Sequence, residues 1–128
     1  MSSTMHHALN LRALRGATTA TANTTEAIHE AVAELVDVLV ERNALAGDQL
    51  LSVTFSVTAD LDACFPAAIA RRRPGWEQVA LLDCQQMAVD GDLPRCIRLL
   101  AHAWLEQHQP VRHAYLRDAA RLRPDLAG

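Results

Sequence analysis

The sequence predicts an α+β domain in which one mixed β-sheet carries a long helix and a short helix. Two patterns predict this class: one segment repeats apolar residues at helical spacing, and several others alternate apolar and polar residues as strands do. The length of 128 residues suits a single domain that buries one core without disulfides. We therefore treat residues 1–128 as one domain, with 1–7 as a flexible N-terminal extension.

The N-terminal part is predicted as a strand followed by a long helix. The strand covers residues 8–15 and ends in a turn at Gly16, whereas the small residues 17–21 suit either a strand or a loop. An amphipathic helix is predicted over 25–43, because residues 23–26 (NTTE) offer an N-cap and an acidic first turn. Its expected buried face consists of Ile28, Ala31, Val32, Leu35, Val36 and Leu39.

The central part is predicted as a strand followed by a short helix. Residues 50–58 alternate, so hydroxyl side chains point away from the core and suit either solvent or an interface. The expected core-facing residues are Leu51, Val53, Phe55 and Val57. Turn residues follow over 58–62, and Pro66 suits the first turn of a helix over 66–72.

The C-terminal part is predicted to complete the sheet. Residues 76–89 carry two short extended pieces, and Asp90-Gly91 is typical of a hairpin turn. Strands are expected over 96–104 and 111–116. One face of the first would carry Ile97, Leu99, Ala101 and Ala103, and the other Arg98, Leu100, His102 and Trp104. So few helices cannot cover both faces of the sheet, and oligomerisation is the simplest way to bury the second face.

Composition excludes several functional classes. All 12 basic residues are arginine, which excludes a Schiff-base lysine, a P-loop lysine and a lysine general base, although genome composition explains the bias equally well. The net charge of −3 argues against binding to nucleic acid or an anionic membrane. No apolar run approaches the roughly 18–20 residues that span a bilayer.

The cysteines and the N-terminus indicate a reducing, cytoplasmic compartment. Cys64, Cys84 and Cys96 are odd in number and lack CxxC spacing, which argues against a disulfide scaffold and a zinc site. The first residues lack the basic and apolar regions of a signal peptide. The adjacent His6 and His7 are interpreted as incidental, so no metal is expected.

Candidate chemistry depends on where the arginines lie. Arg98 is inside an otherwise apolar strand, where a guanidinium is unfavourable unless it meets an anion, either a ligand or a structural carboxylate. Arg15 closes the first strand immediately before Gly16. The run 71–73 suits the C-terminal end of a helix, and Asp83, at the end of an apolar run, suits a solvated turn.

At these residues the sequence resembles the AroH-class chorismate mutases. The resemblance covers nearly the whole chain after the first few residues. Five motifs occur in the family's order and at its spacing, with about one residue of slack in the loop before Pro110. They are Arg15-Gly16-Ala17-Thr18-Thr19; Thr58-Ala59-Asp60-Leu61-Asp62-Ala63 with Phe65-Pro66-Ala67; Cys96-Ile97-Arg98; Arg112-His113-x-Tyr115-Leu116; and Leu122-Arg123-Pro124-Asp125-Leu126.

The resemblance implies a homotrimer whose sheets pack into a pseudo-barrel, with active sites in the clefts between subunits. It implies the Claisen rearrangement of chorismate, a dianion, to prephenate, with no cofactor and no covalent step. Catalysis of that reaction needs a cation at the ether oxygen, anion clamps, and a cleft that holds the compact conformer.

The resemblance also implies roles for individual residues. Arg98 is expected at the ether oxygen and a carboxylate of the substrate, and Arg15 and Tyr115 at the substrate's side-chain carboxylate. Phe65 and Ala67 of the neighbouring subunit would form a wall. The positions expected at the mouth of the site and in the C-terminal segment that closes it are Arg71, Leu122 and Arg123.

One departure from the family lies between positions 83 and 86. The family has a cysteine followed three residues later by a glutamate, whereas an ungapped alignment places Asp83 and Gln86 there, with Cys84 one residue out of register. Asp83 would then supply the carboxylate while Gln86 keeps a neutral hydrogen bond to the same hydroxyl group. The alternatives are an enzyme for a chorismate analogue in a specialised pathway, or a trimeric binding homologue without catalysis.

Overall fold

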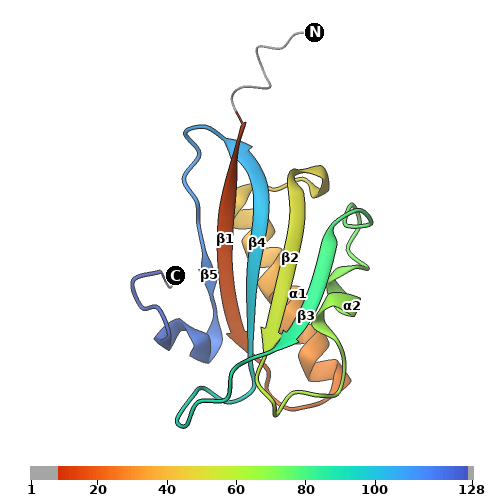
Figure 1. The fold of residues 1–128 in the computed structure, drawn as a ribbon, viewed down its shortest axis with the longest axis vertical. Helices are drawn as coiled ribbons and strands as arrows, with labels where there is room; N and C mark the ends of the chain where they lie inside the picture. Colours follow the sequence, from red (N-terminus) through yellow and green to blue (C-terminus); the bar gives the residue numbers. More distant parts are fainter. Residues whose placement is uncertain (1–8, 127–128) are drawn as a thin grey trace, which may run out of the picture.

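The computed structural model describes residues 9–126, which form a five-stranded mixed sheet with helices on one face (Figure 1). The strand order across the sheet is β3-β2-β4-β1-β5. The strands and helices are β1 (Leu9–Thr19), α1 (Thr25–Asn43), β2 (Leu50–Val57), α2 (Pro66–Ala70), β3 (Ala80–Gln85), β4 (Cys96–Glu106) and β5 (Ala114–Tyr115). This arrangement confirms the predicted α+β class, while the expected N-terminal extension and the histidine pair at positions 6 and 7 lie outside the described residues.

Helix α1 forms where its local chemistry predicts it. The Thr24 hydroxyl accepts a hydrogen bond from the Ala27 N–H at 3.0 Å, and Ala44 ends the helix in the left-handed conformation with φ of 50°. The whole predicted apolar face is buried against the sheet: Ile28, Ala31, Val32, Leu35, Val36 and Leu39. In Figure 1 the helix lies behind the strands, so the viewer looks at the other face of the sheet.

The predicted turn at Gly16 is wrong, because β1 continues through this residue to Thr19. Gly16 pairs with Leu99 of β4 and has a packing role. A Cβ atom at this position would lie 3.1 Å from both Leu35 Cδ1 and the Ala114 carbonyl oxygen. Glycine therefore lets α1 and β5 approach the strand closely.

The alternation predicted for β2 is confirmed from Val53 onward, and Leu51 is the exception. Val53 and Phe55 are buried, whereas Leu51 is exposed and Leu50 is buried in its place. A register irregularity between Leu50 and Ser52 shifts the start of the strand by one residue. In β4 the alternation holds throughout, with Ile97, Leu99, Ala101 and Ala103 in the core.

The remaining predicted elements are shortened or reconnected. Residues 76–89 contain a single strand, α2 ends at Ala70, and β5 has only two residues. Asp90-Gly91 does not form a hairpin, because β3 and β4 both pair with β2 and β3 runs parallel to it. A short 3-10 helix over Arg117–Arg121, labelled η3, was not predicted.

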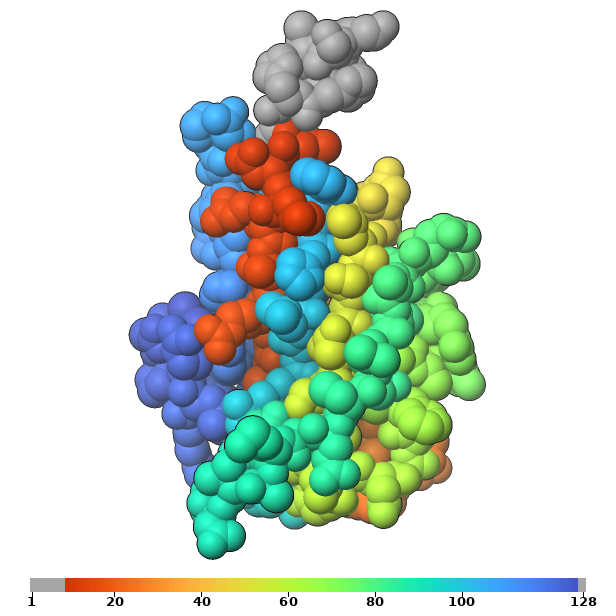
Figure 2. Space-filling model, viewed as in Figure 1, coloured from red at the N-terminus to blue at the C-terminus, as the bar shows by residue number. Residues whose placement is uncertain are grey.

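Among residues 9–126, no helix or loop covers the face of the sheet opposite α1 (Figure 2). Large apolar side chains reach solvent there, with Leu82 62% and Leu100 42% exposed. Between them lie the predicted hydroxyl groups of β2, of which Ser52 is 3.1 Å from His102 Nδ1. Within residues 9–126 no helix combines the length and apolar character that crossing a membrane requires.

Candidate active site

Arg98 lies near the start of the central strand β4, on the open sheet face, and lines a cavity of about 340 Å³. Strand register places it between Ala17 of β1 and Ser56 of β2, so that all three side chains point to the same face. Arg15, Ser56 and Tyr115 also line the cavity. Two of the predicted anion clamps, Arg15 and Tyr115, are thus brought together with the predicted main cation.

The Arg98 guanidinium has one carboxylate partner and, among its other donors, one that is buried without an acceptor. Its Nη2 lies 3.3 Å from Asp92 Oδ1 in the loop between β3 and β4. Its Nε is buried and has no hydrogen-bond partner among the described residues. A buried donor without an acceptor is unfavourable by about 1–3 kcal/mol, so the residue is disposed to bind an anion.

Gln86 joins Arg98 on the open face. Its backbone N–H donates to the Val57 carbonyl at 2.7 Å, which extends the pairing of β3 with β2 by one residue. Its side-chain Oε1 accepts a hydrogen bond from the Ser56 hydroxyl at 2.7 Å. Ser56 is the register partner of Arg98, so Gln86 is bonded to a neighbour of the arginine.

The strand pair β1–β5 contributes Arg15, Gly16 and Tyr115 to the Arg98 cavity, and the C-terminal segment packs next to it. The Arg15 backbone N–H donates to His113 Nδ1 at 2.9 Å. Burial, and then the positive charges of Arg15 and Arg123, lower the pKa of His113 below its ordinary 6.5. Leu122 packs against the buried Tyr115, and Arg123 forms an ion pair with Asp125 at 2.8 Å.

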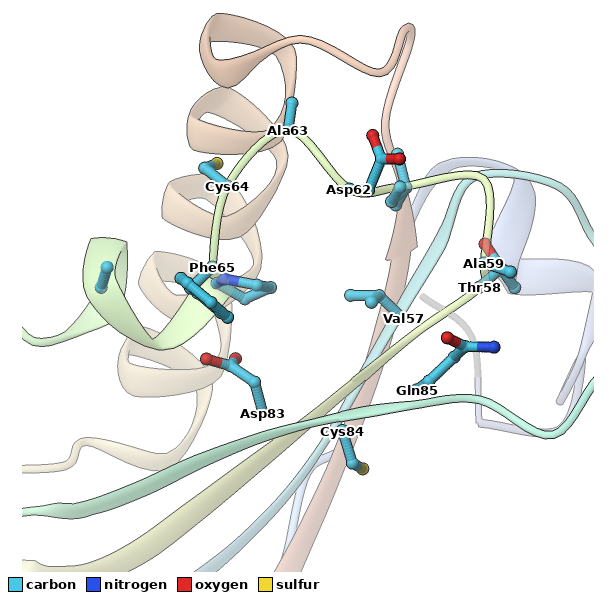
Figure 3. Close-up of a pocket in the computed structure, with 13 residues that line it drawn as sticks. Val57, Thr58, Ala59, Asp62, Ala63, Cys64, Phe65, Asp83, Cys84 and Gln85 are labelled. Carbon is cyan, nitrogen blue, oxygen red and sulfur yellow. The ribbon is translucent and has the colours of Figure 1, made fainter.

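A second group of predicted residues lies around α2, as Figure 3 shows for Phe65 and Asp83. Phe65 is 70% exposed at the start of the helix. Asp83 Oδ1 accepts a hydrogen bond from the Ala67 N–H at 3.0 Å. Burial raises the pKa of Asp83, and the bond from Ala67 offsets this only in part. Phe65, Ala67, Arg71 and Asp83 line a cavity of about 460 Å³.

Within one chain, Asp83 and Gln86 do not share a site. Asp83 pairs with Phe55, whose side chain is in the core, whereas Cys84 pairs with Ser56 of the open face. Figure 3 shows the side chains of Asp83 and Cys84 on opposite sides of β3. The predicted site residues therefore fall into two groups within one chain. We name them the Arg98 half-site, with Arg15, Gln86, Tyr115, Leu122 and Arg123, and the Phe65 half-site, with Ala67, Arg71 and Asp83.

Cavity size alone would favour the surroundings of Phe65 over those of Arg98. A cavity of about 650 Å³ lies beside Phe65 and Cys64, but no arginine lines it. An anionic ligand would favour the smaller cavity at Arg98, because arginine side chains bind anions.

Two residues of the Arg98 half-site, Ser56 and Asp92, were not singled out from the sequence. The alternation of β2 could have pointed to Ser56, because it lies on the hydroxyl face. No local sequence pattern predicts that the loop carrying Asp92 brings its carboxylate to Arg98. In the part of the chain that the structure describes, no three or more His, Cys, Asp or Glu side chains gather as metal ligands would.

Comparison with known proteins identifies close relatives. The family model for chorismate mutase type I matches residues 11–126. The chain is 46% identical to chorismate mutase AroH of Thermus thermophilus over 118 residues, which is 91% of this chain and 96% of that protein. Identity to chorismate mutase AroH of Bacillus subtilis (strain 168) is 36% over 118 residues, covering 91% and 93% of the two chains.

A solved structure has the same fold. The chorismate mutase from Clostridium thermocellum superposes with a TM-score of 0.78 at 37% sequence identity. The match covers 86% of this chain and 98% of that one.

Proposed function

Because the chain belongs to the chorismate mutase type I family, we propose that it catalyses the rearrangement of chorismate to prephenate. The observation that carries this proposal is the buried, unpartnered Nε of Arg98 in a cavity that also holds Arg15 and Tyr115. Such a cavity suits an anionic substrate, and the rearrangement needs no group beyond those of the chain.

The proposed chemistry is electrostatic. As the carbon–oxygen bond breaks ahead of carbon–carbon bond formation, negative charge grows on the ether oxygen and positive charge on the ring. Arg98 would stabilise the oxygen, since a fixed donor favours the transition state over the ground state. Arg15 and Tyr115 would hold the side-chain carboxylate, which restricts the substrate to its compact conformer.

The complete site is proposed to form between subunits of a homotrimer. Arg98 and Phe65 belong to separate half-sites of one chain, so a cleft containing both requires a second copy. The exposed Leu82, Leu100 and Trp104 also favour burial of the open face against other subunits. Static light scattering tests the assembly: a trimer is expected, and a stable monomer at micromolar concentration would contradict both the assembly and the shared site.

The carboxylate that faces the substrate ring is proposed to come from Asp83 of a neighbouring subunit. Gln86, held by Ser56, would keep a neutral hydrogen bond to the ring hydroxyl. The Phe65 half-site would thus bring an anion to a cleft whose other wall carries Arg98. Arg71 would lie at the mouth, and Leu122 and Arg123 in the segment that closes over the substrate.

The replacement of the family's glutamate by Gln86 favours a second candidate, an enzyme that acts on a chorismate analogue. A binding homologue without catalysis fits less well, since it has no need of the unpartnered donor at Arg98. We place the enzyme in the cytoplasm, in keeping with the free thiols of Cys64, Cys84 and Cys96.

The test is to follow the loss of chorismate absorbance with purified protein and to identify the product. Prephenate is expected from the native chain. Arg98→Ala should lower kcat by about 10²–10³-fold, the loss typical of one preorganised donor. The matched control is Arg72→Ala, because Arg72 is exposed and carries the same charge but lies outside both half-sites. An Arg98→Ala protein with normal turnover would refute the assignment.

A further inference from the structure

Asp92 is the carboxylate nearest to the predicted catalytic cation in the described chain. Its Oδ1 lies 3.3 Å from Arg98 Nη2, and its side chain is only 21% exposed. It also lines a cavity together with Gln86. Neither the motifs nor the family resemblance singled out this residue.

The loop holds the Asp92 carboxylate in place independently of Arg98. Oδ1 also accepts a hydrogen bond from the Leu93 N–H at 2.8 Å. The Asp92 N–H donates to the Val89 carbonyl at 3.1 Å. At the end of the loop, the Arg95 N–H donates to Asp60 Oδ2 at 2.9 Å. These hydrogen bonds hold the Asp92 carboxylate in place without any contribution from Arg98.

We propose that Asp92 is a positioning residue that holds one end of the Arg98 guanidinium and keeps its remaining donors aimed at the substrate cleft. Binding at Nη2 leaves the buried Nε without an internal partner. A guanidinium is planar, so fixing one nitrogen restricts where the others point. The catalytic part of this inference rests on the proposed function.

The two effects of Asp92 on a dianionic substrate have opposite signs, which makes the residue testable. Its orientation of Arg98 promotes the chemical step, whereas its negative charge weakens binding of the dianion. Asp92→Ala should therefore lower kcat by about 10–100-fold, as misplaced catalytic groups do, without raising KM. Asp92→Asn keeps an oxygen acceptor at Oδ1 and should lose less kcat.

The matched control is Asp90→Ala, which removes the same charge from an exposed position in the same loop. This variant should retain the native kcat. If Asp92→Ala shows the same kcat as Asp90→Ala, the positioning role is refuted. A lower KM with unchanged kcat would also overturn it, since Asp92 would then act only as a competing anion.

A second readout needs no activity and so separates this inference from the proposed function. With ¹⁵N-labelled arginine, the Nε–H signal of Arg98 can be assigned by its loss in Arg98→Lys. Its exchange with solvent should be slow in the native protein, severalfold faster in Asp92→Ala, and unchanged in Asp90→Ala. Equal exchange in all three proteins would overturn the positioning role, even if chorismate is converted. If Asp92→Ala loses the protection of Nε–H but the native protein does not convert chorismate, the proposed function is refuted and the positioning role stands.

Discussion

Asn43 joins the end of α1 to the segment that leads into β5, and its removal should destabilise the fold strongly. The side chain is 1% exposed. Its Nδ2 donates to the Leu39 and Arg112 carbonyls at 2.9 and 2.7 Å. Its Oδ1 accepts from the Arg112 N–H at 2.9 Å. Both backbone groups of Arg112 thus depend on one carboxamide.

The expected magnitude for Asn43→Ala follows from these bonds. Each backbone group left without a partner is unfavourable by about 1–3 kcal/mol, and the lower end applies because the Arg112 side is open to water. Alanine's higher helix propensity offsets roughly 0.5 kcal/mol. The free energy of unfolding should therefore fall by about 2 kcal/mol, which corresponds to a Tm decrease of roughly 6–10 °C for a chain of this size.

Urea unfolding at one fixed protein concentration measures this loss, because an oligomer's apparent stability depends on concentration. The control is Gln109→Ala, which removes only the hydrogen bond from Nε2 to the Asn43 carbonyl and should destabilise by about 1 kcal/mol. If Asn43→Ala is no less stable than Gln109→Ala, the proposed role of the carboxamide as a buried clamp is refuted.

Further predictions concern the displaced carboxylate and the pH dependence of stability. Asp83→Asn should lower kcat more than it raises KM, and adding Gln86→Glu to that variant should recover much of the lost kcat. If steady-state kinetics show no effect of Asp83→Asn, or no recovery with Gln86→Glu, the changed-substrate alternative is favoured. Because burial raises the pKa of Asp83, its charge opposes folding as pH rises above the ordinary 3.8, so Asp83→Asn should not lower the urea midpoint at neutral pH. The lowered pKa of His113 means that the unfolded chain binds the proton more readily, so stability should fall as pH falls below 6.5. His113→Gln should flatten this dependence in urea titrations between about pH 5 and 7, and an unchanged slope would contradict the assignment.

Local chemistry made α1 predictable to the residue. Its N-cap bond joins Thr24 to Ala27, three residues away, and its apolar face follows directly from helical spacing. The start of β2 was not predictable in the same way. The irregularity that exposes Leu51 arises from pairing with β4, which lies some fifty residues further along the chain.

The candidate site was predictable as a set of residues but not as an arrangement. The motifs identified Arg15, Arg98 and Tyr115, which the structure brings into one cavity. The separation of Asp83 from Gln86 follows from their odd spacing, since strand side chains three residues apart point to opposite faces. The spacing of three residues is visible in the sequence. It predicts opposite faces only if the backbone stays extended beyond Gln85, where β3 ends. The approach of Asp92 to Arg98 depends on loop folding that no local pattern predicts.

The central claim is that one catalytic site contains the Arg98 half-site of one subunit and the Phe65 half-site of another. Its most direct test is complementation between Arg98→Ala and Phe65→Glu, which places a carboxylate on the exposed wall that should face a dianion. Each variant alone should be inactive toward chorismate. Co-expression in equal amounts should restore about one quarter of the native sites, because in a cyclic trimer that share of interfaces joins two intact half-sites. No recovery of activity from soluble mixed trimers would contradict the claim.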